Sequence, residues 1–358
     1  MYSIVSPVRT DVTRLRAFCG AALAAAGASQ SDAAVAAGVL VRTDARGVHS
    51  HGVRTLPSHV RNLLDGGTTS PVSVEVVRQS AVTAVVDGRN GIGHVVASRA
   101  VDLAIDKART SGVGVALVRN SNHFGAAGHY ALTAAEAGFI GLATSNASPI
   151  MTAAGSRSKM LSNAPFAYAI PTGDFPMALD ISMSATAGMK VRMAAERGEE
   201  MPEGLVVDAD GRTTTDPREY AAGGALAPLG GHKGYGLALL TETLAGALSG
   251  SAMTSAVVPW LVNPGTPSGA GHSFLVMDVE SFMERKEFDD RMRELMAEMR
   301  SAEPAPGVER VLVPGELEHE HERRALADGL DLDGVTWGHL EQVAQQLDLH
   351  EQWDAVPL

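Results

Sequence analysis

The sequence contains a single cysteine, Cys19, in 358 residues. This excludes an intrachain disulfide and a zinc site built from several cysteines, and it favours a reducing compartment. No apolar run reaches the roughly 20 residues that span a bilayer. The alanine-rich residues 17–28 follow three arginines, but they are too weakly hydrophobic for a signal peptide. The sequence therefore predicts a cytoplasmic protein without a membrane segment.

Positive charge is also scarce, with 29 Lys+Arg against 41 Asp+Glu and a net charge of −12. Binding to nucleic acid or to an anionic membrane surface favours clustered cations, so we expect neither as a partner. Aromatic residues make up only 4% of the chain, whereas 45% of the residues are hydrophobic and 38 are glycines. This balance is typical of a packed α/β protein of one or two domains.

The usual phosphate-binding fingerprints are missing. The pairs Gly91–Gly93 and Gly112–Gly114 begin a G-x-G-x-x-G pattern, but Val96 and Leu117 stand at the third glycine position. Their side chains would obstruct the close approach to a pyrophosphate that glycine allows. Neither G-x-x-x-x-G-K nor G-x-S-x-G occurs. A Rossmann motif, a P-loop and a nucleophile elbow are therefore excluded.

Hydrophobic periodicity divides the chain into helical ends and an α/β centre. Near the amino terminus it predicts three helices: one that begins at about Thr13, one from the Ser29–Asp32 cap cluster to Asp44, and one over 57–64. It predicts further helix from Lys286 onward. The helix over 234–248 is expected to be buried, because leucines nearly encircle it. The stretch 207–217 is expected to be turn-rich. The centre is predicted to contain strands at 81–87, 113–119, 139–145, 164–170, 177–181 and 273–278, and helices at 91–110, 128–138 and 185–197.

This order of elements predicts an α/β (α+β) fold with termini that pack together. We expect residues 1–75 and 300–358 to form one discontinuous helical domain, into which an α/β domain of residues 76–299 is inserted.

The densest polar segment is DARGVHSHGVR at 44–54, which contains Arg46, His49, His51 and Arg54. A histidine beside a fixed cation suits proton transfer next to a bound carboxylate, which a bidentate arginine can hold. The alternative is a helix end whose cations satisfy exposed carbonyl groups.

Three further positions suit ligand binding. His123 lies in the loop NSNHFGAAG after a strand, where α/β proteins place ligands; it could equally cap the next helix. His232 and Lys233 begin a helix after a glycine-rich turn, which favours an anion site. Asp180 ends a strand and suits ribose hydroxyls, or the cap of the next helix.

Two groups of residues could bind a metal ion. The first is His49, His51 and His59, and the second is the EHEHE run at 318–322. The run is more typical of a solvated helix face, and no spaced third ligand set accompanies either group. We therefore expect no metal. A metal-dependent hydrolase or lyase remains the alternative from another class, and a small-acid binding protein is the non-catalytic one.

These motifs resemble the malate/L-lactate dehydrogenase family of the sulfolactate-dehydrogenase-like type, which is unrelated to the Rossmann-fold dehydrogenases. The likeness covers essentially the whole chain: RGVHSHG at 46–52, NSNHFG at 120–125, SNASP at 145–149, LD at 179–180, TTTDP at 213–217, LGGHKGYGLAL at 229–239 and PGE at 314–316.

The resemblance implies hydride transfer between NAD or NADP and C2 of a 2-hydroxy or 2-oxo acid, or reduction of a cyclic imino acid. It also implies a non-Rossmann, mixed-sheet nucleotide-binding domain inserted into a helical domain from both termini. The protein would be a homodimer with the active site near the interface.

By position, His51 resembles the proton donor and His123 a second catalytic histidine. The residues that resemble dinucleotide-binding positions are Pro176, Asp180, Ser182, His232, Lys233, Gly315 and Glu316. We expect Arg46 or Arg54 to hold the substrate carboxylate. Thr55 stands where the family usually has arginine, and Ser162–Pro165 replaces Gly-Thr-Asn-Pro, so the substrate pocket is expected to differ.

Overall fold

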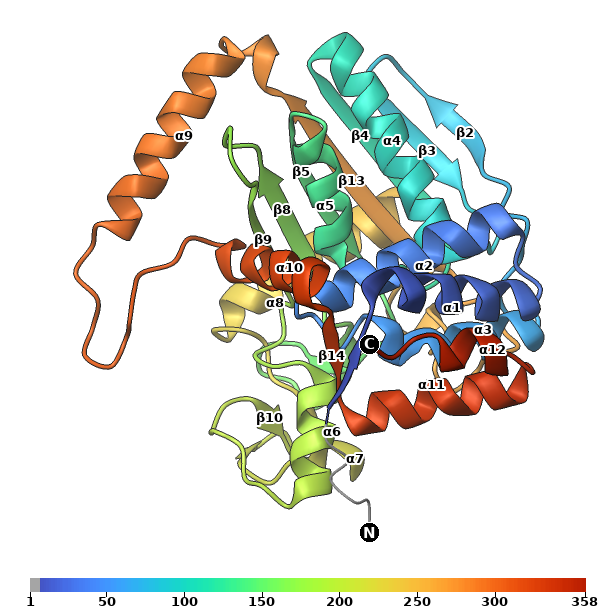
Figure 1. The fold of residues 1–358 in the computed structure, drawn as a ribbon. Helices are drawn as coiled ribbons and strands as arrows, with labels where there is room; N and C mark the ends of the chain where they lie inside the picture. The colour runs from blue at the N-terminus through green and yellow to red at the C-terminus, as the bar shows by residue number, and fades with distance from the viewer. Residues whose placement is uncertain (1–6) are drawn as a thin grey trace.

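A seven-stranded mixed sheet forms the centre of the molecule (Figure 1). The computed structural model describes residues 7–358. Among neighbouring strands of this sheet only β3 and β4 run parallel. The mixed, non-Rossmann architecture predicted from the sequence is therefore confirmed. In sheet order the strands are β2 (Glu75–Gln79), β3 (Thr83–Asp87), β4 (Val113–Ser121), β13 (Ala270–Asp278), β5 (Phe139–Ser145), β8 (Phe166–Ile170) and β9 (Met177–Ile181).

Helices pack closely on this sheet because glycines in the strands leave room for them. Helices α4 (Gly93–Ser111) and α5 (Ala127–Glu136) lie in front of the strands in Figure 1. A Cβ atom at Gly114 of β4 would lie 1.9 Å from the Ala104 carbonyl oxygen of α4. A Cβ atom at Gly271 of β13 would lie 1.7 Å from the Ala245 carbonyl oxygen in the π-helix η2 (Thr243–Leu248). Only glycine permits these approaches.

The two ends of the chain meet in a helical layer beside the sheet. Strand β1 (Val8–Thr10) pairs antiparallel with β14 (Leu330–Leu332), and Arg9 Nε lies 2.9 Å from Asp331 Oδ1. The helices of this layer are α1 (Val12–Ala25), α2 (Gln30–Ala45), the 3-10 turn η1 (Val53–Thr55), α3 (Leu56–Leu64), α10 (Glu316–Asp328), α11 (Gly334–Gln346) and α12 (His350–Asp354). The Ser29 hydroxyl accepts a hydrogen bond from the Asp32 N–H and caps α2, at the predicted position.

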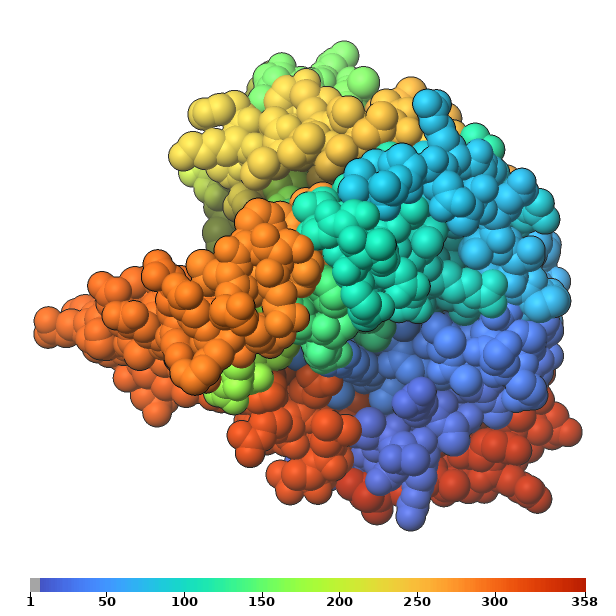
Figure 2. All heavy atoms as spheres, turned by 90° about the horizontal axis from the view of Figure 1, so that it is seen from above, coloured from blue at the N-terminus to red at the C-terminus, as the bar shows by residue number. Residues whose placement is uncertain are grey.

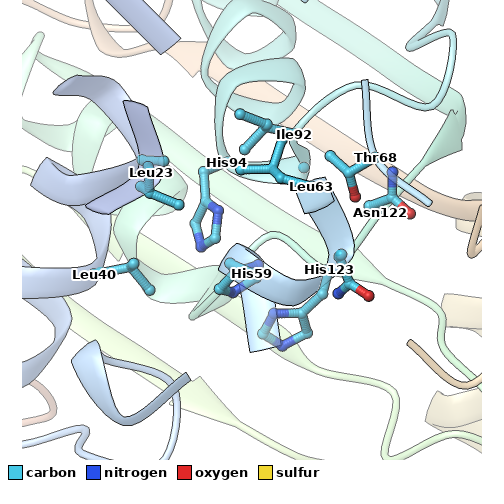
Figure 3. Close-up of a pocket in the computed structure, with 12 residues that line it drawn as sticks. Leu23, Leu40, His59, Leu63, Thr68, Ile92, His94, Asn122 and His123 are labelled. Atoms are coloured by element: carbon cyan, nitrogen blue, oxygen red, sulfur yellow. The ribbon is translucent and has the colours of Figure 1, made fainter. Parts of the chain in front are cut away.

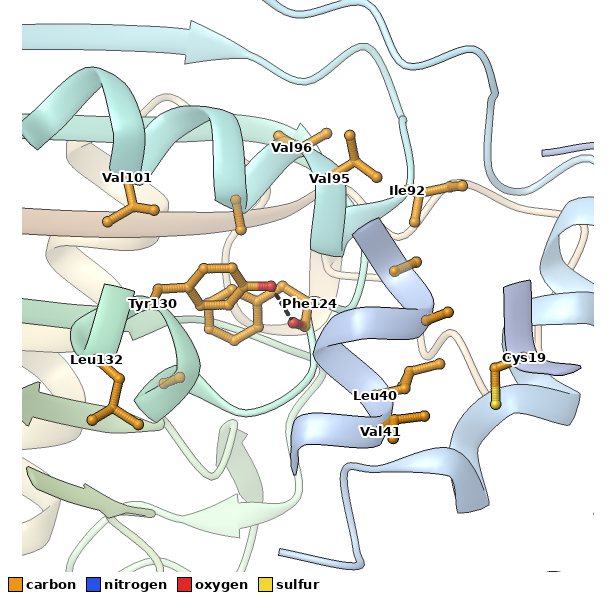
Figure 4. Packing of buried hydrophobic residues seen from close by; sticks show 14 of the residues in the cluster. Cys19, Leu40, Val41, Ile92, Val95, Val96, Val101, Phe124, Tyr130 and Leu132 are labelled. Atoms are coloured by element: carbon orange, nitrogen blue, oxygen red, sulfur yellow. Dashed lines mark hydrogen bonds between the residues drawn. The ribbon is translucent and has the colours of Figure 1, made fainter. Parts of the chain in front are cut away.

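One apolar core runs through both the helical layer and the sheet. Figure 4 shows Leu40 and Val41 of α2 on the side toward Cys19 of α1, and Phe124 and Tyr130 below α4. The Tyr130 hydroxyl donates a hydrogen bond to the Phe124 carbonyl oxygen, which satisfies the only polar atom of this side chain. Because the core is continuous, the division into domains at 1–75 with 300–358 and at 76–299 stays a prediction. Residues 1–6 of the first domain lie outside the described residues.

A smaller sheet with its own core lies at the bottom of Figure 1. Its strands, in order, are β11 (Thr213–Thr214), β10 (Val206–Val207), β12 (Ala225–Leu226), β6 (Met151–Thr152) and β7 (Lys159–Leu161). Helices α6 (Gly188–Arg197) and α7 (Arg218–Ala221) accompany it. The stretch 207–217, expected only to be turn-rich, contains the turn of a β10–β11 hairpin. Asp208 Oδ1 accepts the N–H groups of Asp210 and Arg212 there.

The prediction of a buried helix over 234–248 is wrong for the described chain. Helix α8 (His232–Glu242) continues into η2, and Leu237, Leu239, Leu240 and Leu248 are 48%, 42%, 49% and 61% exposed. The side that packs inward carries the small residues Gly234, Ala238 and Ala245 instead. A single sheet can cover only one side of a helix, so leucines around the circumference cannot all be buried.

Helix α9 (Arg285–Arg300) extends away from the body of the molecule, as Figures 1 and 2 show. The chain then returns through residues 301–313 to α10. Met296 of α9 packs with Phe175 and Val313 in a small separate cluster. The remaining short turns are η3 (Thr254–Ala256) and η4 (Val279–Ser281).

Candidate active site

His51 and His123 meet although 72 positions separate them in the chain. His51 lies in the turn after α2, and His123 follows the end of β4. Their ring centroids are 5.8 Å apart, with planes inclined by 20°. The structure thus places the two predicted histidines at one site.

A buried carboxylate shapes the turn that carries His51. Asp44, at the end of α2, hydrogen-bonds to His49 Nδ1 at 2.9 Å and accepts the Val53 N–H. A Cβ atom at Gly52 would lie 2.0 Å from Asp44 Oδ2, so only glycine lets the turn close over this carboxylate. Within the turn, Ser50 Oγ lies 2.8 Å from His51 Nδ1. His49, a candidate metal ligand from the sequence, therefore has a structural contact.

Both histidines line a cavity of about 200 Å³, which we call the His51 cavity. Its walls come from the ends of β5 and β9, the start of β13, the loop after β4 and further loops beside them. The lining residues are Val48, Ser50, His51, His123, Phe124, Gly125, Ala126, Ala127, Ser145, Asn146, Ala147, Asn163, Pro165, Asp180, Ile181, Ser182, Ala187, Trp260, Ser268 and Ala270. No lysine or arginine is among them.

A second cavity, of about 410 Å³, adjoins the first and is called the Arg46 cavity. Val48, Ala126, Asp180 and Ile181 line both. The Arg46 cavity alone is lined by Arg42, Thr43, Arg46, Gly128, His129, Leu132, Ala178, Leu179, Leu312, Val313, Pro314, Gly315, Leu317 and Glu318. The two cavities are therefore neighbours, and Asp180 belongs to the walls of both.

Asp180 is held by the first turn of α5. Its Oδ2 accepts the Gly128 N–H at 2.7 Å, and a Cβ atom at Gly128 would lie 2.9 Å from the same oxygen. Desolvation by the surrounding protein raises the pKa of the Asp180 carboxyl group from 3.8 to about 6, although the residue is exposed to the two cavities and the Gly128 hydrogen bond and Arg46 oppose the shift. At neutral pH the carboxylate is predominantly ionised and faces both cavities.

The imidazoles at the site are neutral at neutral pH. Burial lowers the pKa of His51. Burial lowers the pKa of His123 further, and the neighbouring His59, His51 and His272 add to this shift. A neutral imidazole can accept a proton at one ring nitrogen while the other carries hydrogen.

Arg46 and Arg54, the residues expected to hold the substrate carboxylate, do not line the His51 cavity in the single chain. Arg46 Nη1 lies 2.6 Å from Glu322 and faces the Arg46 cavity. Arg54 Nη1 lies 3.7 Å from Asp333 Oδ2, and the Thr55 hydroxyl donates to the Gly52 carbonyl oxygen at 2.8 Å. The acidic partners come from α10 and the start of α11, which the sequence could not place beside α2.

The residues predicted to bind a dinucleotide lie around the two cavities to different degrees. Asp180 and Ser182 line the His51 cavity, and Gly315 lines the Arg46 cavity. A Cβ atom at Gly315 would lie 2.8 Å from the Ala178 nitrogen, so glycine lets this turn lie against β9. Pro176 lines neither cavity.

The other three candidates lie outside the cavity walls. Glu316 accepts hydrogen bonds from Arg300 Nε at 3.0 Å and the Val313 N–H at 3.2 Å, so its carboxylate has a structural role. His232 and Lys233 are exposed at the first turn of α8. This turn lies beside the His51 cavity, because the Gly234 backbone approaches the Met183 carbonyl oxygen next to Ser182.

Sequence reasoning missed Trp260, whose indole stacks on His123 with centroids 4.2 Å apart and planes 16° apart. Trp260 also stacks on His59 at 4.9 Å. The tryptophan lies in residues 249–269, between η2 and β13, which contain no recognisable motif. An isolated tryptophan in a loop was the only signal available.

The described residues, 7–358, contain no group of three His, Cys, Asp or Glu side chains arranged to hold a metal ion. His319 of the EHEHE run stacks on Phe175 at 4.7 Å rather than joining a ligand set. The metal-dependent alternative therefore gains no support from the side-chain arrangement. In the same part of the chain, no helix combines the length and apolar character needed to cross a membrane.

Comparison with known proteins agrees with this architecture. The family model described as malate/L-lactate dehydrogenase matches residues 10–341. A malate dehydrogenase of Pyrococcus horikoshii is 37% identical, with 86% of this chain and 87% of that protein covered. Its solved structure superimposes with a TM-score of 0.89 over 97% of each chain, at 33% identity.

Two further relatives carry other activities in their names. An L-sulfolactate dehydrogenase of Methanocaldococcus jannaschii is 36% identical, with 90% of this chain and 93% of that protein covered. A Δ1-pyrroline-2-carboxylate/Δ1-piperideine-2-carboxylate reductase of Pseudomonas putida is 32% identical, with the same coverage of 90% and 93%. The chain, with its mixed sheet and paired histidines, belongs to the malate/L-lactate dehydrogenase family of oxidoreductases.

Proposed function

We propose that the protein transfers a hydride between a nicotinamide dinucleotide and C2 of a small 2-hydroxy or 2-oxo acid, with the reaction in the His51 cavity. The meeting of His51 and His123 in that cavity carries the proposal. The reaction needs a proton acceptor or donor beside the substrate oxygen: a neutral imidazole accepts the proton during oxidation, and the imidazolium donates it during reduction.

The residues of the adjoining Arg46 cavity fit a dinucleotide. His129 Nδ1 is an enclosed ring nitrogen without a hydrogen-bond partner among residues 7–358, and Gly128 and Gly315 leave backbone close to the cavity. Asp180 would bind ribose hydroxyls, and Arg46 would lie near the phosphates or ribose. When bound, the nicotinamide accepts or supplies the hydride.

His51 is the proposed proton donor and acceptor. The hydrogen bond between Ser50 Oγ and His51 Nδ1 fixes the orientation of the ring and leaves Nε2 to exchange a proton with the substrate oxygen. In the oxidising direction the hydroxyl proton moves to Nε2, and in the reducing direction Nε2 returns it. His123, beside His51 and stacked on Trp260, completes the wall against which the substrate lies.

A reductase of cyclic imino acids is the second candidate, because two observations favour it. The His51 cavity has no cationic side chain in the single chain, which is unfavourable for a second negative charge such as that of malate or sulfolactate. The flat face of Trp260 in the cavity suits a planar, apolar ring. The carboxylate next to C2 in either substrate class can accept a hydrogen bond from the amide of Asn163, which lines the cavity, whereas both amide hydrogens of Asn146 are donated to Glu242 and Ala252.

A substrate panel tests these proposals. Pyruvate, oxaloacetate, sulfopyruvate and Δ1-piperideine-2-carboxylate are assayed with NADH and with NADPH by the loss of reduced-nicotinamide absorbance. We expect turnover of the compounds with one negative charge to show lower KM than turnover of the two dianions. Binding of these acids without any change in that absorbance would refute the dehydrogenase and support a binding protein.

We propose that the protein is a homodimer with its active site near the interface. The exposed leucines of α8 and η2 form an apolar surface, which in water favours coverage by another protein surface. The start of α8 lies beside the His51 cavity, so a second copy on this surface would approach the site. Light scattering after size-exclusion chromatography measures the mass. We expect a dimer that Leu240→Glu dissociates, while Leu64→Glu, at an equally exposed leucine of α3, leaves it intact.

A further inference from the structure

A third, very small cavity lies behind His123, on the side away from the substrate (Figure 3). We call it the His94 cavity. His123 lines both this cavity and the His51 cavity. The polar walls are His59 of α3, His94 of α4, Asn62, Thr68, Asn122 and His123, and the apolar walls include Leu23, Leu40 and Ile92.

The imidazoles around the His94 cavity lie close together but do not bond to one another. The ring centroid of His59 lies 4.7 Å from that of His94 and 5.6 Å from that of His123. The centroids of His94 and His123 are 6.4 Å apart. Stacking and edge contacts account for these distances. Figure 3 shows the three rings turned toward the same space.

Four ring nitrogens here are enclosed and have no hydrogen-bond partner in the described protein. They are His123 Nδ1, His59 Nε2 and both nitrogens of His94. Asn122 cannot serve them, because its amide nitrogen donates to the carbonyl oxygens of Asn90 and Gly91 and its oxygen accepts the Ser268 N–H. Buried polar atoms are almost always hydrogen-bonded to protein or to ordered water.

The size and charge of the cavity select its occupant. A volume of about 10 Å³ admits one water molecule and nothing larger. No charged side chain lines it, and burial lowers the pKa of His59, His94 and His123 well below the ordinary value, with neighbouring imidazoles adding to the shift. The rings are neutral, and each offers one hydrogen and one lone pair.

We propose that the His94 cavity binds one water molecule that bridges His123 Nδ1 to His59 and His94, and that these two histidines are positioning residues for His123. The water accepts the Nδ1 hydrogen of His123 and donates its own hydrogens to His59 Nε2 and to a ring nitrogen of His94. This fixes the tautomer of His123, with Nε2 as the lone pair on the substrate side. No proton is gained or lost in this arrangement.

Histidine tautomers are measured directly by ¹⁵N shifts in long-range ¹H–¹⁵N spectra of the folded protein, with the His123 signals assigned by His123→Ala. We expect wild-type His123 to carry hydrogen on Nδ1. In His59→Phe and in His94→Phe, which remove hydrogen-bonding groups, we expect a mixture of tautomers, and in His94→Asn partial recovery. Val60→Ala, at a buried apolar position of α3, is the matched control and should keep the wild-type tautomer.

The kinetic consequence rests on the proposed function. We expect kcat to fall by about 10- to 100-fold in the two phenylalanine variants, by analogy with partners that orient metal-bound imidazoles, with unchanged NADH or NADPH affinity. Wild-type spectra with hydrogen on Nε2, or an unaltered tautomer in both phenylalanine variants, would overturn the inference. A crystal structure of the wild-type protein with no density for water in this cavity would also overturn the inference. This measurement does not depend on whether His94→Phe folds. If the tautomer behaves as expected but no substrate is turned over, only the proposed function fails.

Discussion

At the scale of single residues, surroundings decide which groups can exchange protons near pH 7. Desolvation by the surrounding protein shifts the pKa values of Asp180, His51 and His123, but in opposite senses, although all three side chains line a cavity. Burial disfavours the charged form, so it raises the pKa of the carboxyl group and lowers those of the imidazoles. At a given pH, each of these groups is therefore more often uncharged in the folded protein than the same group in water.

Replacing either paired histidine should impair proton transfer more than binding. We expect His51→Ala and His123→Ala each to lower kcat by about 10²–10⁴-fold, the usual contribution of general acid–base catalysis. The dissociation constant for reduced cofactor, measured by quenching of tryptophan fluorescence, should change little. Normal turnover in both variants would contradict the assignment.

Asp180 should make stability depend on pH in a predictable sense. Its folded pKa of about 6 lies above the ordinary 3.8, so between these values the folded chain binds more protons than the unfolded one, and this group's contribution to stability falls as pH rises. We expect Asp180→Asn to gain stability relative to wild type between about pH 4 and pH 6, with no further gain above that range. Urea unfolding at several pH values measures the difference.

Asp331 provides a control of opposite sign. Arg9 lowers the pKa of the Asp331 carboxyl group through a hydrogen bond and its charge. Asp331→Asn should therefore lose stability relative to wild type as pH rises through the acid range. A parallel response of the two variants would mean that burial does not control the ionisation of Asp180.

At the scale of elements, local patterns located most helices and six of the seven strands of the central sheet, but not the exposure of these elements. Ser29 caps α2 as expected, and β4 and β5 begin where alternation and glycines indicate. Strand β2 was missed because all its residues are exposed at the sheet edge, so it lacks an apolar alternation. The sequence predicted helix α8 correctly but predicted its burial wrongly, because the burial of a helix depends on which other elements cover it.

The turn between α2 and η1 should be sensitive to a single methyl group. In Gly52→Ala the new Cβ would lie 2.0 Å from Asp44 Oδ2 and displace the carboxylate that orders the turn. We expect a loss of about 1–3 kcal/mol of unfolding free energy, as for overpacked sites, together with reduced kcat because His51 moves. Gly338→Ala, on α11 with no atom within 4 Å of the new Cβ, should be neutral or stabilising. Equal effects of both substitutions would contradict this explanation.

At the scale of the whole molecule, the carboxyl-terminal helices complete a core begun by the first helices. Trp353 of α12 is 6% exposed and its ring centroid lies 5.0 Å from that of Phe18 in α1. Because the same core cluster extends into the sheet, the helical layer and the sheet are expected to unfold together.

Removal of Trp353 tests this coupling. We expect Trp353→Ala to lower the unfolding free energy by about 3–5 kcal/mol, as for other large buried aromatics, in one cooperative transition. Val335→Ala, at an exposed position of α11, should change it by less than about 0.5 kcal/mol. Circular dichroism and tryptophan fluorescence followed during denaturation should give coincident curves, and separate transitions would show that the two layers fold independently.

The sequence by itself determined the local elements and the chemistry available, because helix caps, apolar periodicity and glycine positions act over a few residues. It also supplied the histidine motifs at 46–52 and 120–125. Only the tertiary structure decided which groups share a space. Folding places His51 against His123, turns Arg46 and Arg54 toward acidic partners from the far end of the chain, and encloses His59 and His94 behind the site. Such contacts depend on packing between elements distant in sequence, which no local pattern encodes.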